Sequence, residues 1–147
     1  MATGWVQVDG QWYFLRSSGA MVTGWMNGGG PWYYLTGSGA MATGWLYDNG
    51  SWYYLDATNG AMATGWFQDG TTWYYSSSSG AMMTGWLNGG SSWYYLSGSG
   101  AMVTGWLHLG SSWYYMGGSG AMVTGTQVVD GHRSTFESSG RWVGYAS

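Results

Sequence analysis

One unit of this sequence reads Met41-Ala42-Thr43-Gly44-Trp45-Leu46-Tyr47-Asp48-Asn49-Gly50-Ser51-Trp52-Tyr53-Tyr54-Leu55, and it is one of six closely similar copies. The first tryptophans of the copies are Trp5, Trp25, Trp45, Trp66, Trp86 and Trp106, and the second ones are Trp12, Trp32, Trp52, Trp73, Trp93 and Trp113. A spacing of about twenty residues is typical of an array whose units stack on their neighbours. The sequence therefore predicts a repeat protein. The phrase Met1-Ala2-Thr3-Gly4-Trp5 already lies inside a repeat, so we expect a piece of a longer array.

A two-residue turn signal lies between the two tryptophans of each copy, and a seventh signal follows the last copy. The pairs are Asp9-Gly10, Gly29-Gly30, Asn49-Gly50, Gly70-Thr71, Gly90-Ser91, Gly110-Ser111 and Asp130-Gly131. Asp-Gly, Asn-Gly and Gly-Gly favour a type I′ turn, whereas Gly followed by Thr or Ser favours type II′. The sequence therefore predicts an all-β solenoid of about seven stacked β-hairpins.

A two-residue turn also fixes which residues face each other across a hairpin. In the quoted unit Tyr47 should face Trp52, and Trp45 should face Tyr54. Opposed residues lie on the same side of a hairpin, which gives one face with Trp45, Trp52 and Tyr54 and another with Leu46, Tyr53 and Leu55. Both faces are apolar, so we expect both to be covered when consecutive hairpins stack.

The seventh unit departs from the pattern. It has Thr126 and Arg133 in place of the tryptophans, Ser134 and Thr135 in place of the tyrosines, and adds Phe136, Trp142 and Tyr145. Terminal repeats are often atypical because they cover the end of a stack. We therefore expect six hairpin repeats over residues 1–125 and a degenerate C-terminal capping repeat over residues 126–147.

Composition excludes several classes of protein. Charged residues are 6% of the chain, lysine is absent and the formal net charge is −3, so the chain lacks the basic face that a nucleic-acid-binding protein needs. It has no cysteine for a disulfide or a thiolate metal site. No apolar run approaches the ~18 residues of a membrane span.

No recurring group of residues indicates catalysis. Asp9, Asp48, Asp69 and Asp130 lie in or beside turns, where aspartate has a local structural role. His108 and His132 have no partners at metal-ligand spacing, so both are expected to be structural or to face solvent. Serine is abundant in the connectors, without a repeated histidine or aspartate that could activate it. We therefore expect no enzyme activity, no metal and no cofactor in this chain.

The recurring aromatic residues point to binding. Rings around a gap direct their negative π faces inward, and this attracts a quaternary ammonium ion. Aromatic platforms also stack on sugar rings, and large side chains in a small hairpin can serve as core alone. The spacing leaves a cation cage, a sugar platform and a plain core open.

The phrases Trp52-Tyr53-Tyr54-Leu55 and Gly60-Ala61-Met62-Ala63-Thr64-Gly65-Trp66 resemble the choline-binding, or cell-wall-binding, repeat. This family occurs in surface proteins and wall hydrolases of Gram-positive bacteria and their phages. The resemblance covers residues 1 to about 125 closely. It implies a left-handed superhelical solenoid that holds choline, as the phosphocholine of teichoic acids, in aromatic cages between repeats. It also implies a secreted, wall-associated parent protein that carries any catalytic domain elsewhere.

The resemblance assigns a cage to two tryptophans of one repeat, a tyrosine of the next repeat and a methionine wall. By position, the five cages are Trp5, Trp12, Tyr33 and Met41; Trp25, Trp32, Tyr53 and Met62; Trp45, Trp52, Tyr74 and Met82; Trp66, Trp73, Tyr94 and Met102; and Trp86, Trp93, Tyr114 and Met122. The second tyrosine of each pair, such as Tyr54, is the alternative to the first. A sixth cage at Trp106 and Trp113 lacks its tyrosine, because Ser134 stands there, and is expected to be weak or absent.

Two other functions stay open beside choline binding. Related repeats in glucan-processing enzymes and clostridial toxins bind α-glucans or other carbohydrates, and they share the Gly-Trp and Trp-Tyr-Tyr signals. A ligand-free structural or adhesive stack is the other alternative. It predicts self-association through uncapped apolar ends.

Overall fold

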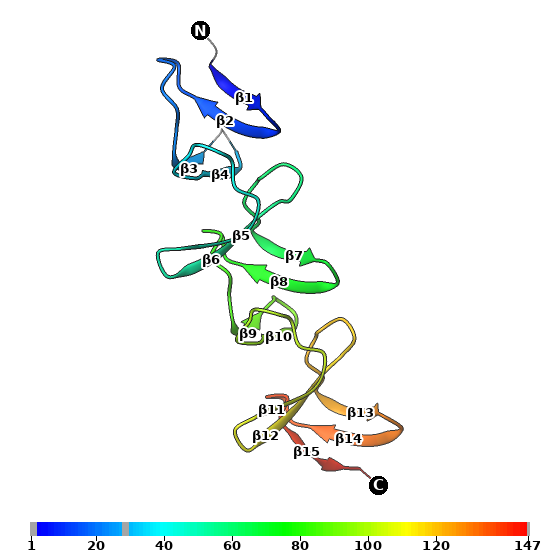
Figure 1. Ribbon diagram of the computed structural model, residues 1–147. Helices are drawn as coiled ribbons and strands as arrows, with labels where there is room; N and C mark the ends of the chain where they lie inside the picture. Colours follow the sequence, from blue (N-terminus) through cyan, green and yellow to red (C-terminus); the bar gives the residue numbers. More distant parts are fainter. Residues whose placement is uncertain (1–2, 28–29, 147) are drawn as a thin grey trace. The chain divides into compact units, whose positions relative to one another are not determined.

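The computed structural model describes residues 3–27 and 30–146. Gly29 of the second predicted turn, the first two residues of the predicted repeat segment and the last residue of the predicted capping repeat lie outside these described residues. The strands are β1 Gly4–Val8, β2 Gln11–Leu15, β3 Gly24–Asn27, β4 Trp32–Leu35, β5 Gly44–Asp48, β6 Ser51–Leu55, β7 Gly65–Asp69, β8 Thr72–Ser76, β9 Gly85–Asn88, β10 Trp93–Leu96, β11 Gly105–Leu109, β12 Ser112–Met116, β13 Gly125–Val129, β14 His132–Phe136 and β15 Trp142–Tyr145 (Figure 1). Consecutive strands pair as seven hairpins, and β15 joins the last of them. The prediction of an all-β chain of seven hairpins is confirmed.

The third and sixth turns have the backbone that the sequence predicts, whereas the type I′ prediction for Gly29-Gly30 is wrong at Gly30, whose φ is not positive. Asn49 and Gly50 both have positive φ angles, of 50° and 87°, as a type I′ turn requires. Gly110 has a φ of 60° and is followed by a residue with negative φ, as in type II′. In the third hairpin Tyr47 faces Trp52 and Trp45 faces Tyr54, so the predicted register is confirmed.

The core lies on the leucine face of the hairpins. Leu35, Leu55, Leu96, Met116 and Phe136 end the second strands of five hairpins and are at most 2% exposed. Burial of such a side chain contributes about 1.5–3 kcal/mol. The expectation that both faces are covered is wrong for the second tryptophans, since Trp32 and Trp93 are 41% and 43% exposed. These rings are held in place but stay open to solvent.

The connectors are tight turns that return the chain to the hairpin. After β4, the N–H of Thr36 donates to the carbonyl of Ala40, and Leu35 forms an isolated bridge with Met41. The longer connector accommodates its extra residue with an aspartate turn, because the Asp56 carboxylate accepts hydrogen bonds from the N–H groups of Thr58 and Asn59. The insertion therefore leaves the flanking strands unchanged.

Backbone hydrogen bonds also join a connector to the hairpin that lies one before the hairpin it follows. The N–H of Met62 donates to the carbonyl of Trp32 over 2.8 Å, and Met122 bonds to Trp93 in the same way. These bonds place the methionine that opens one repeat beside the second tryptophan of the repeat two before it. The path of the backbone thus assembles residues of neighbouring repeats into one cluster.

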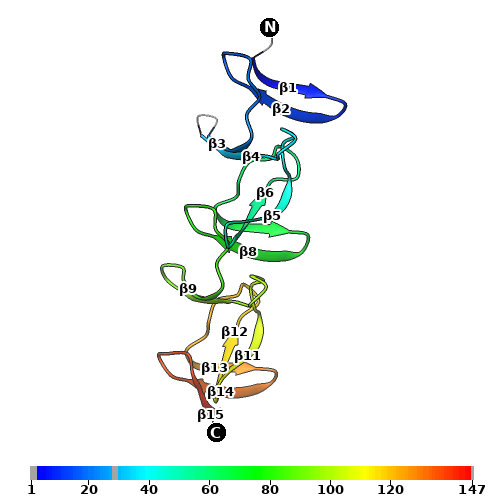
Figure 2. The same ribbon diagram turned by 60° about the vertical axis from the view of Figure 1, so that its left-hand side comes forward.

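The chain forms two compact units, Met1–Phe67 with Ser76–Met82 and Gln68–Tyr75 with Met83–Ser147. In the first unit the hairpins β1–β2, β3–β4 and β5–β6 point in different directions, as comparison of the two views shows (Figure 2). In the second unit β13, β14 and β15 form a three-stranded sheet in that order.

Candidate functional site

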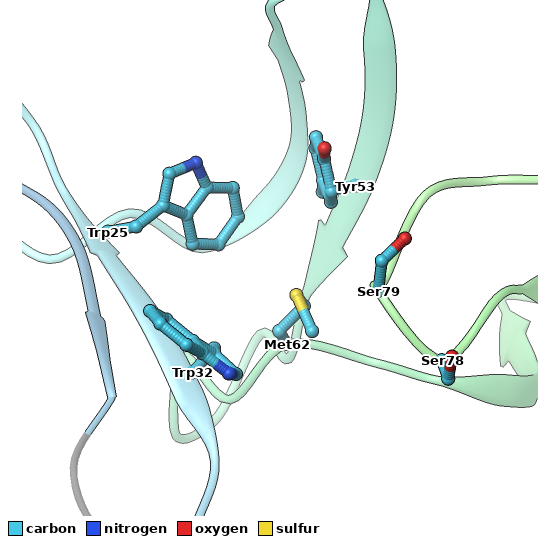
Figure 3. A pocket seen from close by; sticks show the side chains of 6 residues that line it. All are labelled: Trp25, Trp32, Tyr53, Met62, Ser78 and Ser79. Carbon is cyan, nitrogen blue, oxygen red and sulfur yellow. The ribbon is translucent and has the colours of Figure 1, made fainter.

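An aromatic cavity of about 310 Å³ lies between repeats of the first unit. Trp25 on β3 and Trp32 on β4 form one side of it, Tyr53 on β6 and Met62 form the other, and Ser78 and Ser79 lie at its edge (Figure 3). The rings of Trp25 and Tyr53 meet edge to face, with centroids 4.9 Å apart and an angle of 63° between planes. The structure thus brings together all four residues predicted for the second cage.

The protein holds these side chains from several directions. The indole N–H of Trp25 donates to a carboxylate oxygen of Asp48 over 3.0 Å. Tyr34, the second tyrosine of its pair, packs against Trp25 from within the same hairpin, with centroids 5.1 Å apart, and does not line the cavity. The first tyrosine of the next pair, Tyr53, lines it instead. Of the two tyrosines that the sequence left open, the structure places the first one here.

Ser78 and Ser79 come from a connector that lies a further repeat along the chain, and sequence reasoning missed them. Gly80 of the same connector lies directly against Met62, because a Cβ placed on Gly80 would lie 2.7 Å from the Met62 Cε and would overlap its sulfur. This contact explains why glycine recurs at that place in the connectors. Ser78 and Ser79 precede Gly80 in this connector, so this cavity includes residues of three successive repeats.

The same arrangement recurs in the second unit. Trp86, Trp93, Tyr114, Met122, Ser138 and Ser139 line a cavity of about 320 Å³. The two tryptophans lie edge to face at 6.4 Å, and the centroids of Trp86 and Tyr114 are 5.1 Å apart. The residues predicted for the fifth cage are therefore also together.

An exposed ion pair flanks this second cavity. Arg141 donates to both carboxylate oxygens of Glu137, over 3.1 and 2.6 Å, and Ser139 donates to the same carboxylate. The hydrogen bond from Arg141 lowers the pKa of Glu137 from its ordinary value, and the Ser139 bond acts in the same direction. The pairing keeps the arginine charge balanced beside a cavity that is otherwise uncharged.

Contacts also join the four residues predicted for the first cage. Trp5 lies 6.5 Å from Trp12 and 5.0 Å from Tyr33, both edge to face, and the Met41 N–H bonds to the Trp12 carbonyl. The third and fourth cages each include residues of both units, Tyr74 in one and Trp66 in the other. These two cages stay predictions. Within single units, Met82 bonds to Trp52 and Met102 to Trp73, as in the cavities described above.

A further cavity of about 360 Å³ lies at the sixth pair of tryptophans, lined by Trp106, Trp113, Trp142 and Tyr145. Ser134 stands in the place of the repeat tyrosine, as expected, but Trp142 and Tyr145 of β15 line the cavity instead, so the expectation of a weak or absent cage stays untested. Sequence reasoning missed these two rings because the repeat pattern has no strand that corresponds to β15.

The two histidines contact aromatic rings. His108 stacks on Trp113 with centroids 4.1 Å apart and planes at 9°, and His132 lies 5.1 Å from Tyr145. Over residues 3–27 and 30–146, no three His, Cys, Asp or Glu side chains gather as metal ligands would. The same residues form no helix long and apolar enough to cross a membrane.

Comparison with known proteins places these repeats in context. The family model described as the choline-binding repeat matches residues 2–43, 22–67 and 63–104, and one described as a cell wall binding repeat matches residues 104–122. Among curated proteins, none matches the chain.

Several solved structures are similar. CbpJ from Streptococcus pneumoniae TIGR4 is 46% identical with a TM-score of 0.92, over 97% of this chain and 52% of that one. Choline binding protein F from Streptococcus pneumoniae, solved with a peptidoglycan analogue, is 50% identical with a TM-score of 0.89, over 97% and 47%. The endolysin of phage Cp-1 complexed with choline is 42% identical with a TM-score of 0.61, over 83% and 37%. The chain thus spans about half the length of the first two proteins.

Proposed function

Because this chain belongs to the choline-binding repeat family, we propose that choline binds in the cavity of Trp25, Trp32, Tyr53 and Met62 and in the equivalent cavities of the other repeats. One observation carries this proposal. Equivalent sets of two tryptophans, one tyrosine and one methionine line cavities of about 310 and 320 Å³, one in each of the two units.

The chemistry of the lining suits a quaternary ammonium ion. Such a cation has no N–H to donate and is attracted by the faces of tryptophan and tyrosine rings. Among the described residues, no carboxylate lines either cavity. A hydrated metal ion or a primary amine would therefore find no charged hydrogen-bond acceptor there. The methionine side chain contacts methyl groups, and Ser78 and Ser79 can hydrogen-bond the oxygen atoms attached to choline.

Each site is expected to be weak. A cation–π contact contributes about 0.5–2 kcal/mol, so two or three rings give an affinity on the order of millimolar. Several sites on one chain bind a polymer that carries many choline groups far more tightly than any single site. We infer that the array anchors its parent protein to phosphocholine-bearing teichoic acids at the bacterial cell surface. In this account the repeats themselves perform no catalysis.

A similar protein supports this inference, since the endolysin of phage Cp-1 forms a complex with choline. The family relationship also supports a secreted, wall-associated parent protein. Carbohydrate binding is the alternative that the experiment must exclude, because a row of exposed tryptophans can also stack on sugars.

The test is retention on a quaternary-amine resin followed by elution with free choline, with retention on dextran as the competing outcome. Trp32→Ala removes one ring of the second cavity and should shift elution to lower choline concentration. Val128→Ala is the matched control, since Val128 is 69% exposed and lines none of the described cavities. Retention on dextran, or resin binding that free choline does not reverse, would contradict the proposal.

A further inference from the structure

Strand β15 gives the seventh hairpin an element that the internal repeats lack. In the sixth hairpin Met116 forms a single bridge with Met122, after which the chain leaves for the next hairpin. In the seventh, Phe136 pairs with Trp142 at the corresponding place, and β15 then continues along β14. Trp142 therefore occupies the position of a repeat methionine.

The same strand replaces the missing tyrosine. Ser134 stands where the sixth repeat has Tyr114, and it is fully buried. Tyr145 pairs directly with Ser134 across the sheet. Directly opposed residues of an antiparallel pair project to the same side. Tyr145 thus supplies an aromatic ring on the side of the sheet where an internal repeat has its own tyrosine.

The two tryptophans of the sixth repeat keep the geometry of the other cavities. Trp106 and Trp113 lie 6.2 Å apart at 85°, against 6.4 Å and 84° for Trp86 and Trp93. The Trp106 N–H donates to a carboxylate oxygen of Asp130 over 3.2 Å. His108 stacks on Trp113 and limits the rotation of that ring. The pair is therefore ordered before any ligand binds.

The rings of β15 close the cavity around this pair. Trp142 lies edge to face with Trp106 at 5.8 Å and 78°, and with Tyr145 at 5.2 Å and 74°. Four aromatic side chains thus surround a cavity of about 360 Å³ that has no methionine and no serine in its lining.

We propose that Trp106, Trp113, Trp142 and Tyr145 form a sixth quaternary-ammonium site, one that prefers ammonium ions with a bulky aromatic substituent over choline. This inference rests on the proposed function and extends it to a site that the repeat pattern does not contain. The fourth ring adds a face for the cation and for a flat substituent. The absence of serine removes the groups that can bond the choline hydroxyl.

The experiment uses the full chain labelled with 5-fluorotryptophan and follows the indole resonances by ¹⁹F NMR. The Trp142 and Trp32 resonances are assigned by their loss in Trp142→Phe and Trp32→Phe. Choline and benzyltrimethylammonium are titrated separately, with sodium chloride at equal ionic strength as the blank. We expect the Trp142 resonance to shift with both ligands, with a midpoint that is several-fold lower for benzyltrimethylammonium than for choline. The Trp32 resonance should show a smaller difference between the two midpoints.

Tyr145→Ala tests the ring that β15 supplies. Because Tyr145 is 65% exposed, this change should leave the fold intact. The midpoint of the Trp142 titration should rise at least threefold and that of Trp32 should not change. Val143→Ala is the matched control, since Val143 lies on the same strand, is 49% exposed and does not line the cavity.

Two results would overturn the inference while separating it from the proposed function. If Trp32 shifts with ligand and Trp142 does not, the sixth site is refuted and choline binding by the repeats stands. If neither resonance moves in the folded protein, the proposed function fails and the sixth site fails with it.

Discussion

The indole N–H of Trp25 and the carboxylate of Asp48 join two consecutive hairpins through a hydrogen bond of 3.0 Å. Trp106 and Asp130 repeat this relationship at 3.2 Å. In each case a carboxylate at the turn of one hairpin fixes the first tryptophan of the hairpin before it. The position of this tryptophan is therefore fixed before the ligand binds, so less conformational entropy is lost on binding.

Replacing Asp48 by Ala should loosen Trp25 and weaken choline binding at the second cavity. A hydrogen bond to a charged group contributes about 1.5–3 kcal/mol, and we expect only part of this at a half-buried tryptophan, or a several-fold rise in the dissociation constant. The measurement is the choline titration of the Trp25 indole N–H in a ¹H–¹⁵N spectrum.

Asp48→Asn is the matched control because the amide oxygen can still accept the Trp25 hydrogen bond. It should recover most of the affinity that Asp48→Ala loses. Equal loss in both variants would show that the negative charge, and not the hydrogen bond, is what matters.

Replacing Gly80 by Ala should destabilise the chain and disturb the second cavity together. Gly80 has a φ of 90°, and its added Cβ would overlap the side chain of Met62. The left-handed backbone alone costs about 1–2 kcal/mol for a residue with a side chain. Urea unfolding should therefore show a loss of at least that size, and choline binding at the second cavity should weaken.

The control for this change is Gly37→Ala, in a connector where an added Cβ has no atom within 4 Å. Gly37 does not have a positive φ, so alanine should be tolerated there. Equal stability of the two variants would contradict both the cost of the left-handed backbone at Gly80 and the overlap with Met62.

Replacing Ser76 by Ala should stabilise the protein. Ser76 stands where other repeats have Leu35 or Leu55, it is fully buried, and its hydroxyl has no hydrogen-bond partner among the described residues. An unsatisfied buried hydroxyl costs about 1–3 kcal/mol. Thermal unfolding should show a raised melting temperature for Ser76→Ala, whereas Leu55→Ala should lose about 2–5 kcal/mol through the cavity it leaves. A lowered melting temperature for Ser76→Ala would indicate that the hydroxyl is bonded.

The Glu137–Arg141 pair should give a small dependence of stability on pH. Arg141 lowers the pKa of Glu137 in the folded protein. The pair therefore stabilises the fold fully above the unfolded pKa of glutamate, and this contribution is lost as the pH falls through the lower folded value. A carboxyl titration by NMR should show that Arg141→Gln returns the pKa of Glu137 toward its ordinary value. An unchanged pKa in that variant would show that the pairing does not persist in solution.

The sequence predicts those features of the fold that short-range chemistry determines. Asn49-Gly50 permits few turn types, so the hairpin register follows from it, and the register in turn places Tyr53 on the face opposite the tryptophans of its own hairpin. Predicting the residues of the second cavity required one further assumption, that consecutive hairpins stack.

The remaining features depend on contacts that the repeat pattern does not encode. Ser78 and Ser79 reach the second cavity from a connector a further repeat along, and only the packing of Gly80 on Met62 brings them there. The aspartates that hold the tryptophans lie at different places, before the turn at Asp48 and within it at Asp130. No recurring spacing therefore marks them.

The seventh repeat shows the same limit. Ser134 alone predicts a missing ring, because nothing in the repeat pattern indicates that Tyr145 will pair with it across the sheet. That pairing depends on β15 remaining beside β14, and it has no counterpart in the preceding six copies.

The most direct test of the central claim is the melting temperature during titration with choline, compared with 3,3-dimethyl-1-butanol, which has the shape of choline without its charge. A ligand that binds only the folded state stabilises it by mass action, so choline should raise the melting temperature in a saturable way while the neutral analogue has little effect. An equal effect of both compounds would contradict cation recognition by the aromatic cavities, and no effect of either on the folded protein would contradict choline binding altogether.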